Sequence, residues 1–145
     1  MSTPVEASSL SSPPASAAPT TSKAMLWTGR VLSGLSVALF LMSAVMKLSQ
    51  NPQVVQGWQG QQGYPLSTLV PIGIVELLCV VLYAVPRTAV LGALLLTAYL
   101  GGAVATHVRI SDPFTSPIII GVVVWAGLYL RDARIRALVP LRRDP

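Results

Sequence analysis

Glu76 is the residue of this sequence that points most directly to chemistry, because it stands ten residues into an apolar block that covers residues 66–85. An ionisable side chain in the middle of such a helix is costly unless it faces other protein groups, and it is by default a candidate for function. We interpret Glu76 as a proton site or a ligand anchor. The alternative is a carboxyl that only holds neighbouring helices together through hydrogen bonds.

Lys47 and His107 are the groups best placed to accompany Glu76, since each closes an apolar block and both blocks would end at the same level. Glu76 lies about ten residues from that level, roughly 15 Å at a rise of 1.5 Å per residue. A direct ion pair is left open. It requires the helix of Glu76 to begin a few residues later, or the Lys47 side chain to point inward instead of extending to the membrane surface. Tyr99 and Thr97 are the nearest hydrogen-bond donors by depth.

The supply of redox-active and metal-binding residues is small. Cys79 is the one cysteine, so the chain cannot form an intramolecular disulfide or a CxxC pair. His107 is the one histidine and cannot supply both axial ligands of a bis-histidine haem. No second His or Cys stands at metal-ligand spacing, so we expect no metal site and identify no cofactor from the residues. Enzymatic activity is left open, with a non-catalytic role favoured.

The chain that must position these groups is unusually apolar: 52% of its 145 residues are hydrophobic and 10% are charged, with a mean hydropathy of +0.64. Four apolar blocks, about residues 27–48, 66–85, 88–108 and 114–130, are each long enough to cross a hydrocarbon core of roughly 30 Å. We predict an all-α polytopic membrane protein, a bundle of four transmembrane helices over residues 25–135. A disordered Ser/Pro/Ala-rich tail is expected at 1–24 and a short basic tail at 136–145.

Lysine and arginine are unevenly distributed between the two ends of these blocks. Eight of the ten lie at the end that carries both termini, whereas Lys47 and Arg109 lie at the opposite end. Because positive charge concentrates on the cytoplasmic side of membrane proteins, we expect both termini in the cytoplasm. The C-terminal arginines are interpreted as this topology signal and not as a nucleic-acid site, since the segment is short and lacks interleaved aromatic residues.

Two further patterns concern packing. Small residues recur every four positions from Ala89 to Ala105, so we expect this face, which includes Gly101, to lie against another helix. The connection from residue 49 to 64 is the one long loop. Its Trp58 and Tyr64 are expected to rest at the level of the lipid headgroups.

Four short motifs occur in a fixed order: GRVLSG opens the first block, SAVMKL closes it, GIVELL lies within the second and AVATHVR closes the third. With them the chain resembles the DoxX-like family of small bacterial four-helix membrane proteins over about residues 25–135. The resemblance implies a four-helix bundle in the bacterial inner membrane and puts the family's polar positions on Arg30, Lys47, Glu76 and His107. Proteins of this family include a subunit associated with a thiosulfate to quinone oxidoreductase and others linked to oxidative-stress complexes.

The residues and the resemblance support three hypotheses for function. The first is an accessory or binding subunit whose polar cluster holds a small hydrophobic ligand or, by the resemblance, a quinone headgroup. The second is a proton-coupled transporter or a membrane enzyme that uses Glu76 with Lys47 and His107. The third is a purely structural partner in a larger protein complex. The lipid bilayer is the partner common to all three, and nucleic acid is not expected.

Overall fold

The computed structural model describes residues 22–138, and this part of the chain is helical without any β-strand. The long elements are α1 (Lys23–Leu48), α3 (Leu69–Ala84), α4 (Ala89–Arg109) and α5 (Thr115–Arg131). The short elements are α2 (Pro52–Gln56), a π-helical turn η1 (Gly57–Gln61), a 3₁₀ turn η2 (Leu66–Thr68) and a final helix α6 (Ala133–Leu138). The predicted all-α fold class is confirmed for the described residues.

The two expected tails lie mostly outside the described residues. Helix α1 takes in the last two positions of the first tail, where Ser22 caps it by accepting a hydrogen bond from the Met25 amide at 3.2 Å. Helix α6 takes in the first three positions of the second tail. Helix α3 ends before Pro86, because the preceding residue Val85 adopts the extended backbone that proline favours.

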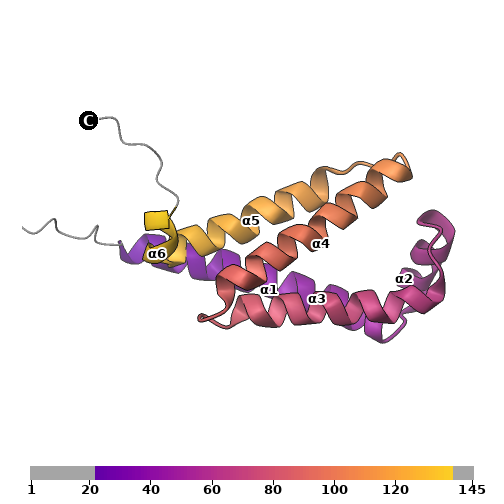
Figure 1. Ribbon diagram of the computed structural model, residues 1–145, viewed down its shortest axis with the longest axis horizontal. Coiled ribbons are helices and arrows are strands. Elements are labelled where there is room, and N and C mark those ends of the chain that lie inside the picture. The colour runs from indigo at the N-terminus through magenta and orange to yellow at the C-terminus, as the bar shows by residue number, and fades with distance from the viewer. Residues whose placement is uncertain (1–21, 139–145) are drawn as a thin grey trace, which may run out of the picture.

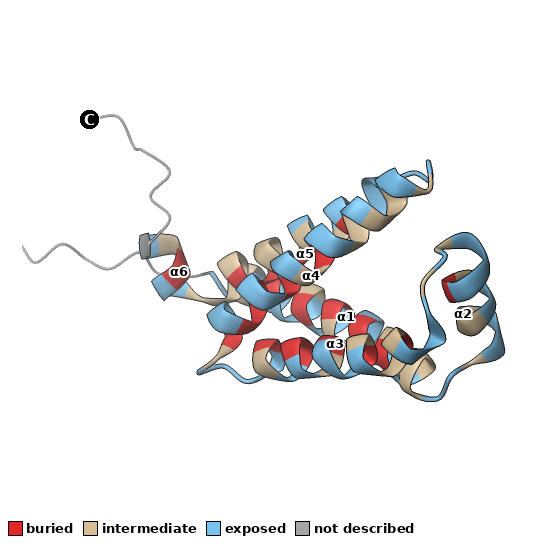
Figure 2. Ribbon diagram, turned by 45° about the vertical axis from the view of Figure 1, so that its right-hand side comes forward, coloured by how far each residue is buried: buried red, intermediate tan, exposed pale blue. Residues whose placement is uncertain are grey.

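The four long helices form a ring in which each packs against two neighbours. Helix α1 contacts α3 and α5, and helix α4 contacts the same two. Figure 1 shows that the pair α1/α3 and the pair α4/α5 lie close together near the termini and diverge toward the end that carries α2. The buried residues lie on the inner faces of this ring (Figure 2), so the core is narrow and runs along the bundle.

The end of the bundle near the termini, which we call the terminal end, is packed through glycines. A Cβ at Gly92 of α4 would overlap the backbone of Tyr83 in α3. A Cβ at Gly127 of α5 would lie 2.8 Å from the Ser33 hydroxyl of α1, and one at Gly29 would lie 2.6 Å from the backbone nitrogen of Arg131. Glycine thus lets the helix backbones meet closely at this end.

The outer surface of the bundle is apolar over most of its length. Large hydrophobic side chains such as Leu35, Leu78, Leu94 and Ile119 are exposed there. Three helical segments are long and apolar enough to cross a membrane: Lys23–Leu48, Leu66–Ala84 and Ala89–Arg109. Helix α5 is apolar but shorter, at 17 residues. These properties are those of a multi-pass membrane protein.

One packing expectation is wrong. Gly101 is exposed, and no neighbouring atom lies within 4 Å of a Cβ placed there. The buried members of its series, Ala89 and Ala93, lie nearer the terminal end. The connection from residue 49 to 64 is largely folded into α2 and η1. Its Trp58 is turned inward, with 7% of its surface exposed. The placement of Trp58 and Tyr64 at the level of the lipid headgroups stays a prediction.

Candidate functional site

Lys47 and Glu76 form a direct ion pair in the half of the bundle away from the termini. The Lys47 Nζ lies 2.9 Å from the Glu76 Oε2 and donates a second hydrogen bond, of 2.6 Å, to the Ser43 hydroxyl. The Glu76 side chain is 2% exposed and that of Lys47 13%. Lys47 therefore points inward, as a direct pair requires.

Local sequence features bring the two side chains together. The 3₁₀ turn η2 runs directly into α3, so the helical segment that carries Glu76 begins at Leu66. Gly73 lies one turn before Glu76, and a Cβ there would stand 3.0 Å from the Lys47 Cβ. The missing side chain at Gly73 thus lets α1 approach α3 beside the carboxyl.

Tyr99 of α4 completes the surroundings of this carboxyl. Its phenol is close enough to the Glu76 carboxyl for the two groups to interact electrostatically. Its ring meets that of Phe40 edge-on, with the two ring centres 6.4 Å apart. The Glu76 carboxyl is thereby held between a cation from α1 and a phenol from α4, and buried side-chain polar atoms among the described residues all have hydrogen-bond partners.

The ion pair lies on the wall of a cavity of about 760 Å³. Ligand sites in proteins typically measure about 300 to 1,000 Å³, so this cavity has the size of a small-molecule site. All four long helices contribute to it, together with the connection between α1 and α3. The polar residues on its wall are Ser43, Lys47, Trp58, Gln62, Tyr64, Glu76, Tyr99, Thr106, His107 and Ser116.

His107 lines the same cavity near the end of α4. Its Nδ1 donates a 2.8 Å hydrogen bond to the Ala103 carbonyl. Its Nε2 lies 3.6 Å from a carboxylate oxygen of Asp112, which is an ion pair whenever the ring is protonated. Among the described residues, no hydrogen bond or ion pair joins His107 to Glu76. Both side chains line the cavity without contacting each other.

The end of the cavity beyond Lys47 is covered by the connection between α1 and α3. The Trp58 Nε1 donates to the Pro65 carbonyl and to the Thr68 hydroxyl, at 3.2 and 3.1 Å. Tyr64 shares a 2.9 Å hydrogen bond with Thr106 of α4. That bond lowers the pKa of Tyr64 from its ordinary value, and the nearby guanidinium of Arg109 lowers it further.

Arg109 ties this cover to the end of α4. Its guanidinium lies 4.7 Å from the centre of the Tyr64 ring and donates to the Gln62 carbonyl. Together with the bond between Tyr64 and Thr106, these contacts hold residues 62–64 against α4. We call residues 57–65 the loop cover.

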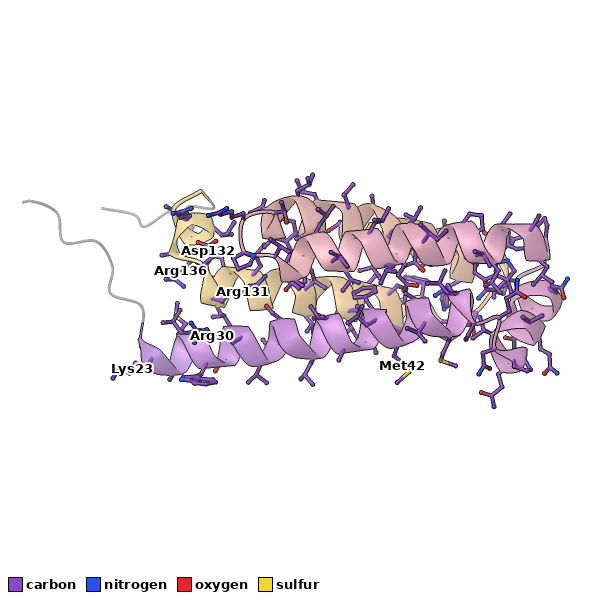
Figure 3. The ribbon with its side chains drawn as sticks, turned by 90° about the horizontal axis from the view of Figure 1, so that it is seen from below. Lys23, Arg30, Met42, Arg131, Asp132 and Arg136 are labelled. Atoms are coloured by element: carbon purple, nitrogen blue, oxygen red, sulfur yellow. The ribbon has the colours of Figure 1, made fainter. Side chains whose placement is uncertain are left out.

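Two of the residues predicted for the site do not line this cavity. Arg30 is exposed and lies at the terminal end, near Lys23 (Figure 3). Its guanidinium is 5.8 Å from the centre of the Trp27 ring. Thr97 donates to the Ala93 carbonyl and accepts from the Trp125 Nε1, both at 2.8 Å. Thr97 thus faces α5 and not the Glu76 carboxyl, although its depth is similar.

Sequence reasoning missed Ser43 and the two aromatic residues of the loop cover. Ser43 precedes Lys47 by four residues, so it stands on the same helix face and a search of that spacing would have found it. Trp58 and Tyr64 reach the cavity only because the connection folds back over it, and no local pattern signals that return.

The arrangement offers several kinds of polar group to a molecule inside the cavity. An ammonium, a buried carboxyl, a phenol and an imidazole lie on one apolar cavity. Within residues 22–138 no group of three His, Cys, Asp or Glu side chains is placed to hold a metal ion.

Comparison with known proteins identifies the family. The family model described as the DoxX-like family matches residues 31–129, which include all four long helices in whole or in large part. No curated protein and no solved structure matches the chain. Because the match covers most of the sequence and all residues of the ion pair and its cavity, the chain belongs to the DoxX-like family.

Proposed function

We propose that this protein crosses the bacterial inner membrane four times and binds a small, largely apolar molecule whose polar head lies beside Lys47 and Glu76. One observation carries the proposal: a buried ion pair is placed on the wall of an apolar cavity of ligand size. In this role the chain is a binding or accessory subunit of a membrane system and supplies no redox group of its own.

The energetics of the pair favour a ligand site over a purely structural contact. Two charges removed from water lose hydration that their mutual attraction repays only in part, so a buried ion pair is weak evidence for stabilisation. A structural pair would be best sealed between helices. Lys47 and Glu76 instead both border the cavity.

The donors of Lys47 suit an acceptor oxygen on the ligand. An ammonium group has three N–H donors. In the described structure two of them are directed to Glu76 and Ser43, so the third is available to a carbonyl oxygen in the cavity. A quinone ring, with carbonyl oxygens on a flat apolar body, has the matching chemistry, and family membership supports testing it first.

Extraction of the purified protein tests this proposal. Organic extracts of the wild-type chain, of Lys47→Met and of Lys23→Met are compared by mass spectrometry. Lys23 is the matched control, because it is an exposed lysine of the same helix at the terminal end. We expect a bound molecule in the wild type and in Lys23→Met and its loss from Lys47→Met. Equal amounts in all three would contradict the proposal, and a stable protein partner without any small molecule would favour a structural role.

A proton-coupled role is the second candidate, and the position of His107 favours it. His107 lines the cavity that holds Glu76 and faces Asp112, so three titratable side chains extend from the cavity toward the end of α4. Proton-coupled transport requires pH-dependent flux of the bound molecule across vesicles. Glu76→Gln should abolish that flux without abolishing folding, whereas simple binding without flux supports the first candidate.

The proposed orientation has both termini in the cytoplasm, supported by eight basic residues at the terminal end against two at the other. Figure 3 shows Lys23, Arg30, Arg131 and Arg136 gathered at that end. Alkaline phosphatase fused after Pro145 should be inactive, and the same enzyme inserted after Gly60 should be active. The reverse pattern would invert the topology.

A further inference from the structure

Leu39 and Met42 border the cavity and the outside of the bundle at once. Both line the cavity, yet 49% of Leu39 and 63% of Met42 remain exposed. Figure 3 shows Met42 pointing away from the bundle along α1. The cavity therefore opens sideways past these two residues, and we call this opening the lateral mouth.

The lateral mouth lies between α1 and α5. In the terminal half these helices are in close contact, with Ser33 against Gly127. In the other half the α5 residues Ser116, Pro117 and Ile120 line the cavity, and Figure 2 shows the α4/α5 pair diverging from the α1/α3 pair. On its opposite side α1 stays closed, because Leu48 packs within 3.4 Å of the position of a Cβ at Gly73 of α3.

The aqueous end of the cavity is the more restricted one. The loop cover places the buried Trp58 and the ring of Tyr64 on the cavity wall. The hydrogen bond between Tyr64 and Thr106 and the contact of Arg109 with Gln62 fasten it to α4. A molecule arriving from water would have to displace these contacts, whereas one dissolved in the bilayer meets an apolar opening.

We infer that the ligand reaches the cavity from within the bilayer, through the lateral mouth, and that it is a membrane-dissolved amphiphile with a polar head and a hydrocarbon chain. The head binds beside Lys47 and Glu76, while the chain lies between Leu39, Met42 and the first turns of α5. The inference rests on the proposed function for the head and adds the route and the chemical class of the molecule.

The test uses the full chain in vesicles of phosphatidylethanolamine and phosphatidylglycerol, with a long-chain alcohol that carries a diazirine on its chain. Illumination expels nitrogen from the diazirine, and the resulting carbene inserts into a bond of a residue that it contacts. Peptide mass spectrometry then identifies the labelled residue. We expect adducts on Phe40 and Ile120 inside the cavity as well as on the outer face. A charged, water-soluble diazirine present on both sides of the membrane should leave Phe40 and Ile120 unmodified.

Narrowing the lateral mouth provides the decisive comparison. Leu39→Trp combined with Met42→Trp should lower the cavity adducts severalfold and leave those on the outer face unchanged. Leu35→Trp is the matched control, because Leu35 is an exposed residue of the same helix that does not line the cavity. Equal cavity labelling by the water-soluble probe, labelling unchanged by the two tryptophans, or no cavity labelling would overturn the inference.

Glu76→Gln separates this inference from the proposed function. If cavity adducts persist in Glu76→Gln but fall in the narrowed variant, the lateral route stands and the carboxylate is not needed to hold the head. If they fall in both, the route and the polar site are both supported.

Discussion

Buried polar groups have different surroundings at the two ends of this bundle. At the terminal end Tyr83 donates a 2.9 Å hydrogen bond to the Val124 carbonyl and lies 3.0 Å from the Ser33 hydroxyl, all within close-packed helices. At the other end Lys47 and Glu76 meet on the wall of a cavity. Helices held firmly at one end can diverge at the other, and the divergence leaves room for a ligand.

Arg131 reinforces the contrast. Its guanidinium lies 5.0 Å from the centre of the Tyr83 ring and donates to the Tyr83 carbonyl at 3.1 Å, so it satisfies the last turn of α3. No comparable clamp joins α1 to α5 beside Lys47 among the described contacts. The terminal end is therefore the more closely packed of the two ends.

Removing the cation at the cavity end should have the largest effect on stability. Lys47→Met leaves the Glu76 carboxylate buried without its partner, and breaking a buried pair in this way costs about 3–5 kcal/mol. We expect a markedly lower melting temperature in detergent. A double variant, Lys47→Met with Glu76→Leu, should recover most of the loss, because apolar residues of similar volume replace a buried pair at little cost. No recovery would mean that the pair itself is essential to folding.

Substitution of two glycines on α4 compares the packing at the two ends directly. Gly92→Ala places a methyl group against the Tyr83 backbone, and overpacking of this kind costs about 1–3 kcal/mol. Gly101→Ala meets open space and should leave stability unchanged or slightly raised, since alanine favours a helix by about 1 kcal/mol over glycine. Thermal unfolding measures both, and equal losses would remove the distinction between the ends.

The sequence permits prediction of the helices and of the ionisable residues that matter. It does not permit prediction of which of these residues contact one another. Apolar blocks and the depth of Glu76 are enough to predict helical segments and a carboxyl that must find a partner. Which group pairs with Glu76 depends on how the helices meet: α1 approaches α3 at Gly73 and brings Lys47 to the carboxyl, whereas Thr97 faces Trp125 of α5. The inward turn of Trp58 and the outward position of Gly101 likewise depend on how the helices are arranged, which no single segment encodes.

Removal of the Tyr83 hydroxyl is a smaller change at the terminal end. Tyr83→Phe leaves the buried Ser33 hydroxyl without this partner, and an unmade buried hydrogen bond costs about 1–3 kcal/mol. Because the two side chains interact, adding Ser33→Ala should cost less in this background than in the wild type. Fully additive losses in chemical or thermal unfolding would show that the hydroxyls act independently.

The smallest expected effect is on the pH dependence of stability, and it comes from Tyr64 in the loop cover. The bond with Thr106, and then the charge of Arg109, hold the pKa of Tyr64 below its ordinary value. A group whose pKa falls on folding stabilises the fold above its unfolded pKa, about 10 for tyrosine, and this contribution is lost as the pH falls through the folded value. Ultraviolet titration should show one tyrosine ionising early, and Tyr64→Phe should remove that step. An unchanged titration curve in Tyr64→Phe would contradict the assignment.

Native mass spectrometry of the full chain tests the central claim most directly, by counting molecules bound beside Lys47 and Glu76. The double variant Lys47→Met with Glu76→Leu is the sharpest comparison, because its expected stability separates lost binding from lost folding. We predict a wild-type chain that carries one small amphiphile and a folded double variant that carries none. The same molecule bound to the same extent in both proteins would contradict the account.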